Sequence, residues 1–354
     1  MDVTDYFDEF TRRDWQTTTE GTVRMAVVGL GSFARNRVLP VFSATEFCEV
    51  TLLVSGSPTK AGAVAEEFAV DRVIGYDEFN SGVATDRYDA VYVATPPAFH
   101  REYTETAARL GKPVLCEKPL ATNVHEAEQM VEACANSGVT LMTAYRLRAE
   151  PAIRRLHELI QDGVIGNPRQ IKAGFSSQLL DNVSPDSWRF DPDIAGGGAL
   201  IDLGVYPLHL TRFLIDSTPD AVWAETTSQS PQFDRVEEHV VVELLFPNGL
   251  TASCTASLNA HPDNRLQVLG TEGQVLIRDP FSGRMSQELL VERHDSQTKY
   301  VGPSVDEVRE EFDYFAHCIL TNADCETDGE EGLTDLRIIE AAYESAETDK
   351  QITI

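Results

Sequence analysis

The chain has 354 residues, of which 42% are hydrophobic and 24% charged, a mixture typical of a folded protein of about two domains. Its 57 acidic and 29 basic residues give a formal net charge of −28, which disfavours nucleic acid and anionic membranes as partners. With only six lysines and with acidic residues along its whole length, the chain is expected in a salt-rich, halophilic cytoplasm, where salt screens the repulsion. A merely acidic protein is the alternative.

Neither export nor membrane insertion is expected. No stretch approaches the roughly 20 apolar residues that span a bilayer, and the first residues lack the basic end and apolar run of a secretory signal. The six cysteines show no paired or His-rich spacing, so they are interpreted as reduced and mostly buried, and no metal site is predicted. Residues 1–21 are predicted to form an N-terminal arm, with a packed leader helix as the alternative.

Residues 22–144 alternate short apolar runs with amphipathic stretches of about a dozen residues. Strands are expected at 23–28, 50–54, 89–95, 113–116 and 139–144. Helices are expected at 61–69, 100–110 and 124–137. This alternation predicts a doubly wound α/β domain, in which helices cover both faces of a parallel sheet.

Residues 145–354 follow a different pattern of longer, partly alternating segments joined by turns such as FPNGL and GTEGQ. Strands are expected at 169–178, 239–246, 250–258, 265–270 and 273–278. Helices are expected at 151–161, 198–214, 305–320 and 333–346. The second half is therefore predicted to be an α+β substrate and oligomerisation domain with a mostly antiparallel open sheet.

A glycine-rich turn follows the first strand, reading GLGSFA from Gly29 to Ala34. In the dinucleotide fingerprint GxGxxG/A, Gly29 permits the tight turn, Gly31 lets the backbone approach a pyrophosphate, and Ala34 lets the helix pack on the strand. Ser32 and Phe33 open that helix, whose N-terminus attracts phosphate. The strand–turn–helix context predicts dinucleotide binding, and a structural turn without a nucleotide is the alternative.

The choice between the two nicotinamide cofactors depends on the end of the second strand. Enzymes specific for NAD usually carry an acidic residue there to hold the ribose 2′-hydroxyl, but this chain has Ser55. Ser57, Lys60 and the arginines Arg35 and Arg37 could accept a 2′-phosphate that a carboxylate would repel. NADP is therefore predicted, unless these cations are only solvated surface groups.

Three further segments carry a family resemblance: ATPPAFH at 94–100, CEKPL at 116–120 and WRFDPDIAGGGALIDLGVYPLH at 188–209. With them the chain resembles the Gfo/Idh/MocA oxidoreductases from about residue 23 to the C-terminal helix, especially the branch with sugar and dihydrodiol dehydrogenases. The leader FTRRDWQ is similar to that of haloarchaeal NADP-dependent D-xylose 1-dehydrogenases.

The resemblance implies that Lys118, between Glu117 and Pro119, lies beside the nicotinamide and that Tyr206 is the acid/base residue. Many members carry His at the position of Tyr206 and pair it with the Asp four residues before, so inositol-type substrates are in doubt. Asp202 would bind a sugar hydroxyl or orient its neighbours. The further contacts expected at the cofactor's nicotinamide ribose are Thr95, Pro96 and His100, with a helix cap as the alternative for His100.

The chemistry of sugar oxidation agrees with that pair. Oxidising an anomeric carbon removes the hydroxyl proton as hydride leaves, so one group must accept a proton. A phenol, with a reference pKa of about 10, is a weak base unless a nearby ammonium stabilises the phenolate. Asp202 and Tyr206 would share one face of a helix. Alternatively, Lys118 is a surface lysine, Tyr206 a core aromatic and Asp202 a helix cap.

Substrate contacts are expected from aromatic and forked cationic side chains, which suit pyranose rings. The candidates are Tyr145, Arg146, Trp188 and Arg189, with ordinary packing as the alternative. Residues 196–198, all glycine, are interpreted as backbone that passes close to cofactor or sugar, or else as a flexible turn.

The resemblance implies an NADP-dependent aldose 1-dehydrogenase that oxidises D-xylose to a xylonolactone. The alternatives are a glucose or dihydrodiol-type dehydrogenase and a non-catalytic dinucleotide-sensing regulator. A homodimer or homotetramer through the C-terminal sheet is expected, since an open sheet leaves one face to be covered.

Overall fold

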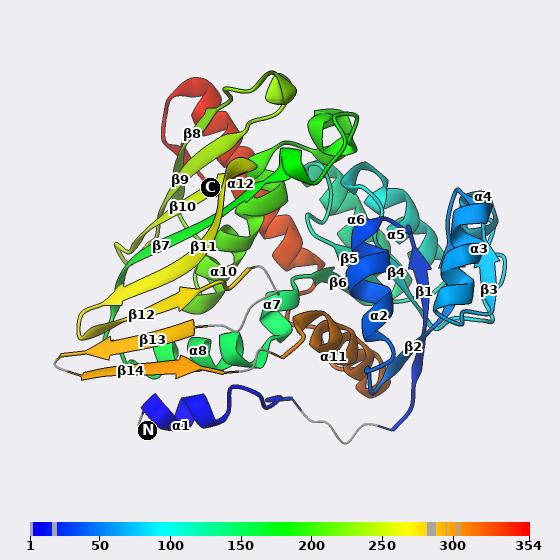
Figure 1. Cartoon of the computed structure of the whole chain (residues 1–354), viewed down its shortest axis with the longest axis horizontal. Coiled ribbons are helices and arrows are strands. Elements are labelled where there is room, and N and C mark those ends of the chain that lie inside the picture. The colour runs from blue at the N-terminus through cyan, green and yellow to red at the C-terminus, as the bar shows by residue number, and fades with distance from the viewer. Residues whose placement is uncertain (1–2, 16–19, 282–287, 295, 303–304) are drawn as a thin grey trace. The chain divides into compact units, whose positions relative to one another are not determined.

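The computed structural model describes residues 3–15, 20–281, 288–294, 296–302 and 305–354. The chain forms two compact units (Figure 1). Unit 1 comprises residues 1–14, 150–305 and 337–354, and unit 2 comprises residues 15–149 and 306–336. Within the described ranges, no helix combines the length and the apolar character needed to cross a membrane.

Unit 2 contains a six-stranded parallel sheet with the order β3-β2-β1-β4-β5-β6. The strands are β1 (Val23–Val28), β2 (Cys48–Val54), β3 (Arg72–Ile74), β4 (Ala90–Val93), β5 (Val114–Glu117) and β6 (Leu141–Ala144). This is the strand order of the doubly wound nucleotide-binding fold, so the prediction of a parallel α/β domain is confirmed. The short strand β3 was not expected from the sequence.

The helices of unit 2 pack on both faces of this sheet. They are η1 (Ala34–Val38), α2 (Leu39–Val41), α3 (Pro58–Glu67), α4 (Tyr76–Asn80), η2 (Pro97–Phe99), α5 (His100–Arg109), α6 (Val124–Ser137), α7 (Arg146–Ala149) and α11 (Glu307–Thr321). On one face, Met25 and Val27 share a core with Phe312 and Phe315 of α11. On the other, α5 packs on β4 and β5 beside α6.

The placement of α11 differs from the predicted ranges, which assigned residues 145–354 together. In the structure α11 packs on β1 and β2 of unit 2. The following helix α12 (Gly329–Thr348) begins in unit 2 and continues into unit 1 from Arg337. Just before α12, the carbonyl of Thr327 accepts a 2.7 Å hydrogen bond from the amide of Thr143 at the end of the parallel sheet.

Unit 1 contains a nine-stranded sheet with the order β14-β13-β12-β11-β7-β10-β9-β8-β15. The strands are β7 (Pro168–Gln178), β8 (Ala221–Thr227), β9 (His239–Leu245), β10 (Thr251–Ser257), β11 (Asn259–Gly270), β12 (Gly273–Arg278), β13 (Glu288–Arg293), β14 (Ser296–Val301) and β15 (Ile352–Thr353). Only β7 and β10 pair in parallel among these neighbours, so the mostly antiparallel sheet is confirmed.

Helices cover one face of this sheet, with α10 packing on β7, β10 and α8. The helical segments of unit 1 are α1 (Val3–Asp8), α8 (Pro151–Gln161), η3 (Leu179–Asp181), η4 (Trp188–Phe190), α9 (Pro192–Ala195), η5 (Leu200–Gly204), α10 (Val205–Ile215) and η6 (Pro231–Phe233). Within the segment expected as an arm, α1 packs on α8, and the hydroxyl of Tyr6 donates a 2.5 Å hydrogen bond to Asp162.

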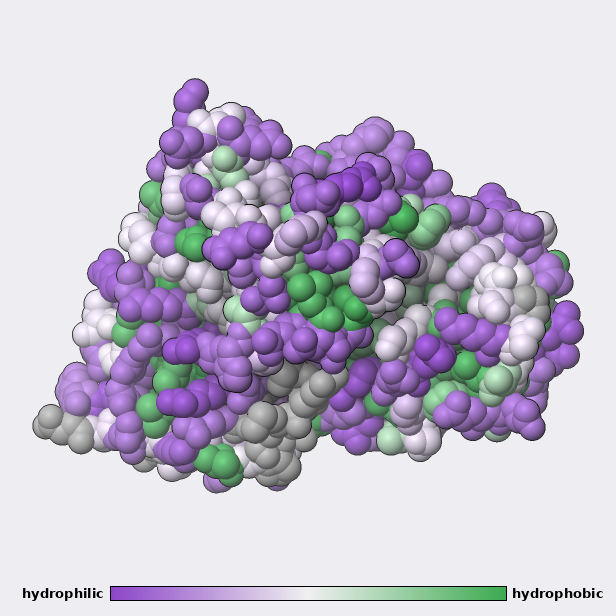
Figure 2. Space-filling view, turned by 45° about the horizontal axis from the view of Figure 1, so that its top comes forward, coloured by the Kyte–Doolittle hydropathy of each residue, from purple (hydrophilic) through white to green (hydrophobic). Residues whose placement is uncertain are grey.

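The surface agrees with the strongly acidic composition. On the face drawn in Figure 2, hydrophilic residues cover most of the area and interrupt the hydrophobic patches. Large apolar side chains that stay exposed in the described residues include Phe99, Val241 and Val301.

Candidate active site

The glycine turn at the end of β1 has the geometry of an anion cradle. Gly29 has a φ of +97°, and a Cβ placed on it would lie 2.8 Å from the carbonyl oxygen of Ala94. A Cβ on Gly31 would meet no protein atom within 4 Å. The carbonyl of Gly31 accepts a hydrogen bond from the amide of Arg35, so a helix begins here and the first-turn amides have no preceding intrahelical partner. The turn therefore fits a phosphate group against Gly31.

An unsatisfied polar atom lies after the neighbouring strand. The hydroxyl oxygen of Thr95, which follows β4, is buried and has no hydrogen-bond partner in the structure. The Thr95 amide also lies 2.9 Å from a Cβ placed on Gly29, so the two loops are in contact. A buried polar group without a partner is costly unless a ligand satisfies it. Thr95 therefore fits the nicotinamide-ribose contact that the family resemblance implies. Pro96, next along the chain, is partly buried.

His100 connects the loops that follow β4 and β5. Its side chain is buried, with Nε2 2.8 Å from the carbonyl oxygen of Thr95 and Nδ1 3.0 Å from that of Pro119. Burial lowers the pKa of His100, and the surrounding backbone carbonyls oppose that shift. Because both ring nitrogens face backbone oxygens, the contacts of His100 support a role in holding the Lys118–Pro119 segment rather than in touching a cofactor directly.

The candidate residues for a 2′-phosphate gather at the start of α3. Ser55 is buried directly after β2, and its hydroxyl accepts a 3.3 Å hydrogen bond from the amide of Ser57. Ser57 is exposed at the N-cap of α3, and Lys60 is exposed in the first turn. Arg37, in contrast, lies 3.9 Å from the carboxylate of Glu307. Arg37 is thus engaged within unit 2, while α3 offers hydroxyls, a helix N-terminus and a cation.

Lys118 follows β5 and is partly buried, and the peptide bond that joins it to Pro119 is cis. Glu117 before it accepts a 2.6 Å hydrogen bond from the hydroxyl of Tyr92. Burial raises the pKa of Glu117, whereas the Tyr92 hydrogen bond and the charge of Lys118 lower it. Burial and the charge of Glu117 raise the pKa of Glu311 on α11 well above its ordinary value. Two acidic side chains therefore lie close together next to Lys118, and the hydrogen bond from Tyr92 holds one of them.

Two predicted sugar contacts take part in the packing of unit 2. Tyr145 is only 2% exposed. Arg146 is buried, and its Nε donates a 2.9 Å hydrogen bond to the buried carboxylate of Glu307. An arginine held in a buried ion pair is costly to move. These contacts support the packing alternative for both residues.

In unit 1 the structure brings three of the predicted residues, Trp188, Arg189 and Asp202, together, and Tyr206 follows four residues after Asp202. Asp202 lies in the π-helical turn η5, and Tyr206 follows in the first turn of α10. Nε of Arg189 donates a 3.3 Å hydrogen bond to Asp202, and its guanidinium lies 4.4 Å from the ring centroid of Trp188. An aromatic ring, a guanidinium and a carboxylate in this arrangement suit a polyhydroxylated ligand.

Aromatic rings surround Tyr206. Its side chain is 6% exposed, and its ring centroid lies 5.8 Å from that of Phe175 and 6.3 Å from that of Phe281. This packing fixes the ring, because the two neighbours come from separate strand and loop segments. π-Helical turns such as η5 are frequent at functional sites, where they reorient side chains.

Two of the three glycines at 196–198 pack closely against other residues of unit 1. A Cβ on Gly197 would collide with the hydroxyl of Tyr343, and one on Gly198 with the carbonyl oxygen of Glu237. Protein groups of unit 1 therefore occupy the space of a side chain at Gly197 and Gly198, and a close approach of this backbone to cofactor or sugar stays a prediction. No local sequence pattern indicates Glu237 and Tyr343, which lie 39 and 145 residues beyond Gly198.

The proposed proton-transfer residues come from both units, Lys118 from unit 2 and Asp202 and Tyr206 from unit 1. Within the described residues, no group of three or more His, Cys, Asp or Glu side chains is arranged to hold a metal ion.

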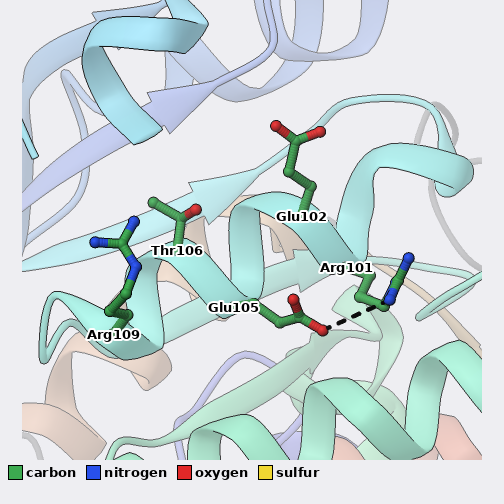
Figure 3. Close-up of a pocket in the computed structure, with 5 residues that line it drawn as sticks. All are labelled: Arg101, Glu102, Glu105, Thr106 and Arg109. Carbon is green, nitrogen blue, oxygen red and sulfur yellow. Dashed lines mark ion pairs between the residues drawn. The ribbon is translucent and has the colours of Figure 1, made fainter. Parts of the chain in front are cut away.

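A surface hollow on α5 is not a candidate site. It is lined by Arg101, Glu102, Glu105, Thr106 and Arg109 (Figure 3). Arg101 pairs with Glu105 at 3.9 Å and donates to Gln129, while Arg109 donates to the carbonyl of Asn80. Because both arginines already have partners within unit 2, neither is left without a partner to bind an anionic ligand in the hollow.

Comparison with known proteins gives two family matches. The model described as "Oxidoreductase family, NAD-binding Rossmann fold" matches residues 23–145, and the "GFO/IDH/MocA C-terminal domain" matches residues 153–276.

The matches to individual relatives cover nearly the whole chain. A D-xylose 1-dehydrogenase [NADP(+)] of Haloarcula marismortui is 42% identical, covering 98% of this chain and 97% of its own length. D-xylose 1-dehydrogenase (NADP(+)) 2 of Haloferax volcanii is 30% identical, covering 93% and 98%. Among solved structures, the aldose-aldose oxidoreductase from Caulobacter crescentus, complexed with glycerol, has a TM-score of 0.89 at 33% identity and covers 94% of this chain and 100% of its own.

Proposed function

The chain belongs to the GFO/IDH/MocA oxidoreductase family, and from this we propose that it is an NADP-dependent aldose 1-dehydrogenase that oxidises D-xylose to a xylonolactone. The observation that carries the proposal is the 42% identity to a D-xylose 1-dehydrogenase [NADP(+)] across 98% of this chain. The serine at position 55, the exposed Lys60 and the start of α3 support NADP as the cofactor.

The reaction assigns a task to each proposed residue. Bound NADP⁺ supplies the acceptor for the hydride that leaves C1 of the sugar. Tyr206 accepts the proton of the C1 hydroxyl, so that the C1–O bond becomes the carbonyl of the lactone as the C1–H bond breaks. Lys118 supplies the positive charge that favours the phenolate. Asp202 and Arg189 bind hydroxyls of the ring, and Trp188 lies under the Arg189 guanidinium.

Initial rates test the proposal. NADPH formation is measured in high salt with xylose, arabinose, ribose and glucose, and we expect the highest kcat/KM with xylose. Tyr206→Phe should lower kcat by at least about 100-fold with little change in NADP affinity, because it removes general-base catalysis. Lys118→Met should also lower kcat, whereas Lys112→Met, a control whose ammonium donates to the carbonyl of Tyr88, should not. Full activity of Tyr206→Phe would contradict the assigned role.

The likeness to an aldose-aldose oxidoreductase supports a second candidate, in which one aldose is oxidised while another is reduced. In that case a single sugar would yield both lactone and alditol, and little NADPH would accumulate. Product analysis of the xylose reaction distinguishes the two, since a simple dehydrogenase forms lactone and NADPH in equal amounts.

We also propose a homodimer or homotetramer formed through the sheet of unit 1. Along β9, Val240 and Val242 are buried, whereas Val241 between them is 38% exposed. Because successive strand residues point to opposite faces, Val241 lies on the face away from the core. Sedimentation in high salt would contradict the proposal if it found only monomers.

A further inference from the structure

Glu237 lies just before β9, and its carboxylate holds the backbone that leads into η5. Oε2 accepts a 2.9 Å hydrogen bond from the amide of Gly198, and Oε1 accepts a 2.8 Å bond from the amide of Leu200. The backbone carbonyl of Glu237 accepts a third bond, of 3.0 Å, from Ala199. Three consecutive amides at the start of a helical segment are therefore satisfied by one residue, where they would otherwise lack partners.

Tyr343 of α12 completes the arrangement. Its hydroxyl donates a 2.9 Å hydrogen bond to Oε1 of Glu237. Burial raises the pKa of Glu237, while the hydrogen bonds from Leu200, Tyr343 and Gly198 lower it. The collision expected for a Cβ at Gly197 or Gly198 shows how closely both residues pack on the glycine segment. Tyr343 and Glu237 therefore both pack against the segment and are bonded to each other.

The segment held in this way carries the proposed chemistry. The carbonyl of Gly198 accepts a 3.0 Å hydrogen bond from the amide of Asp202. The side-chain carboxylate of Asp202 accepts a hydrogen bond from Arg189. Tyr206 follows four residues later. A displacement at Gly198 or Leu200 would be passed through the turns of η5 to both side chains, because consecutive turns are joined by backbone hydrogen bonds.

We infer that Glu237, supported by Tyr343, is a positioning residue that sets the placement of Asp202 and Tyr206 through the backbone of residues 198–200. This inference rests on the proposed function for its effect on catalysis. In this inference Glu237 contacts neither the sugar nor the cofactor, and it affects catalysis only through the backbone amides that it binds. Misplacement of reacting groups by about 1 Å can cost on the order of 100-fold in rate.

The chain offers a matched control in the next residue. Glu238 is buried and also binds backbone amides, accepting hydrogen bonds of 2.6 Å from Gln229 and 2.9 Å from Ser230. Its side chain also accepts from Asn259. Both glutamates therefore stabilise the fold by the same chemistry, but only Glu237 is bonded to the segment that leads to Asp202.

The test compares Glu237→Gln and Tyr343→Phe with Glu238→Gln in the full chain. Glutamine keeps one acceptor oxygen but turns a donor toward one of the two amides, so one hydrogen bond is lost. We expect Glu237→Gln to lower kcat about 10- to 100-fold with an NADP Kd within about twofold of wild type. Tyr343→Phe should lower kcat less, and the double variant should be less than additive. Glu238→Gln should keep kcat within about threefold despite a comparable loss of thermal stability.

Hydrogen exchange gives a readout that does not depend on the substrate. Peptides covering residues 198–206 should exchange faster in Glu237→Gln, and peptides covering 228–230 should do so in Glu238→Gln. If none of the tested aldoses supports NADPH formation by the wild type, the proposed function fails. The exchange result still decides whether Glu237 holds the segment. The inference is overturned if Glu237→Gln retains wild-type kcat and exchange, or if both glutamate variants lose activity in proportion to stability.

Discussion

The hydroxyl of Tyr92 lies 2.6 Å from the carboxylate of Glu117, the residue directly before Lys118. Tyr92 comes from β4 and Glu117 ends β5, so the bond joins adjacent strands of the parallel sheet at the edge where ligands bind in this fold. It satisfies a buried carboxyl group whose pKa burial raises. The placement of Lys118 therefore depends on a phenol in the core as well as on its own loop.

Tyr92→Phe should lower the free energy of unfolding by about 1–3 kcal/mol, because it removes a hydrogen bond from a buried carboxyl group. Tyr88→Phe is the matched control. The hydroxyl of Tyr88 is buried without a hydrogen-bond partner in the structure, so its removal should be neutral or stabilising. Urea unfolding measures both variants, and equal effects would show that the Tyr92–Glu117 bond contributes nothing specific.

Ser55→Asp should change the cofactor preference from NADP toward NAD. A carboxylate at the end of β2 can hold the two ribose hydroxyls of NAD but repels a 2′-phosphate. The ratio of kcat/KM for NADP to that for NAD should fall by at least about tenfold, in line with the loss of a charge-assisted contact. Ser43→Asp, at an exposed serine of the same unit, controls for added charge. An unchanged ratio would place the 2′-phosphate elsewhere.

Much of the architecture could be predicted from local patterns. The alternation of apolar runs and amphipathic stretches predicted the parallel sheet, and the Gly29–Ala34 turn was correctly placed after β1. Helix α8 has the predicted bounds. These features depend on residues close together in the sequence, where periodicity and turn chemistry determine the structure.

The features that could not be predicted depend on partners distant in the chain. The sequence of an amphipathic helix such as α11 shows which face is apolar but not which sheet that face will cover. No local pattern could therefore indicate that α11 packs on the sheet of unit 2. The same holds for Glu237, whose partners lie 37 to 106 residues away. The family resemblance that implied roles for Asp202 and Tyr206 could not indicate the carboxylate that holds their backbone.

The stability contributed by Glu238 should depend on pH in the acid range. Burial raises the pKa of Glu238, but hydrogen bonds from Gln229, Asn259 and Ser230 outweigh this and lower it to about 2, against 4.5 in an unperturbed glutamate. Since the folded-state pKa is depressed, the contribution is fully present above pH 4.5 and is lost as pH falls toward 2. Its size is on the order of 3 kcal/mol.

Unfolding measured between pH 6 and pH 2 tests this expectation. The difference in unfolding free energy between wild type and Glu238→Gln should shrink across that window, because glutamine does not titrate. A difference that stays constant with pH would mean that the charge of Glu238 is not what its hydrogen bonds stabilise.

Gly31→Ala and Gly29→Ala should separate cofactor binding from folding. A Cβ at Gly31 meets no protein atom within 4 Å, so the variant should fold with a stability within about 1 kcal/mol of wild type. If a pyrophosphate lies against this backbone, the added methyl group should raise the NADP Kd at least about tenfold, because the backbone can no longer approach the phosphates closely.

Gly29→Ala should instead destabilise the fold, since it combines a φ of +97° with a Cβ 2.8 Å from the Ala94 carbonyl. Thermal unfolding without cofactor and titration of NADP against intrinsic fluorescence measure the two effects. Wild-type affinity in Gly31→Ala would show that the phosphates do not bind at this turn.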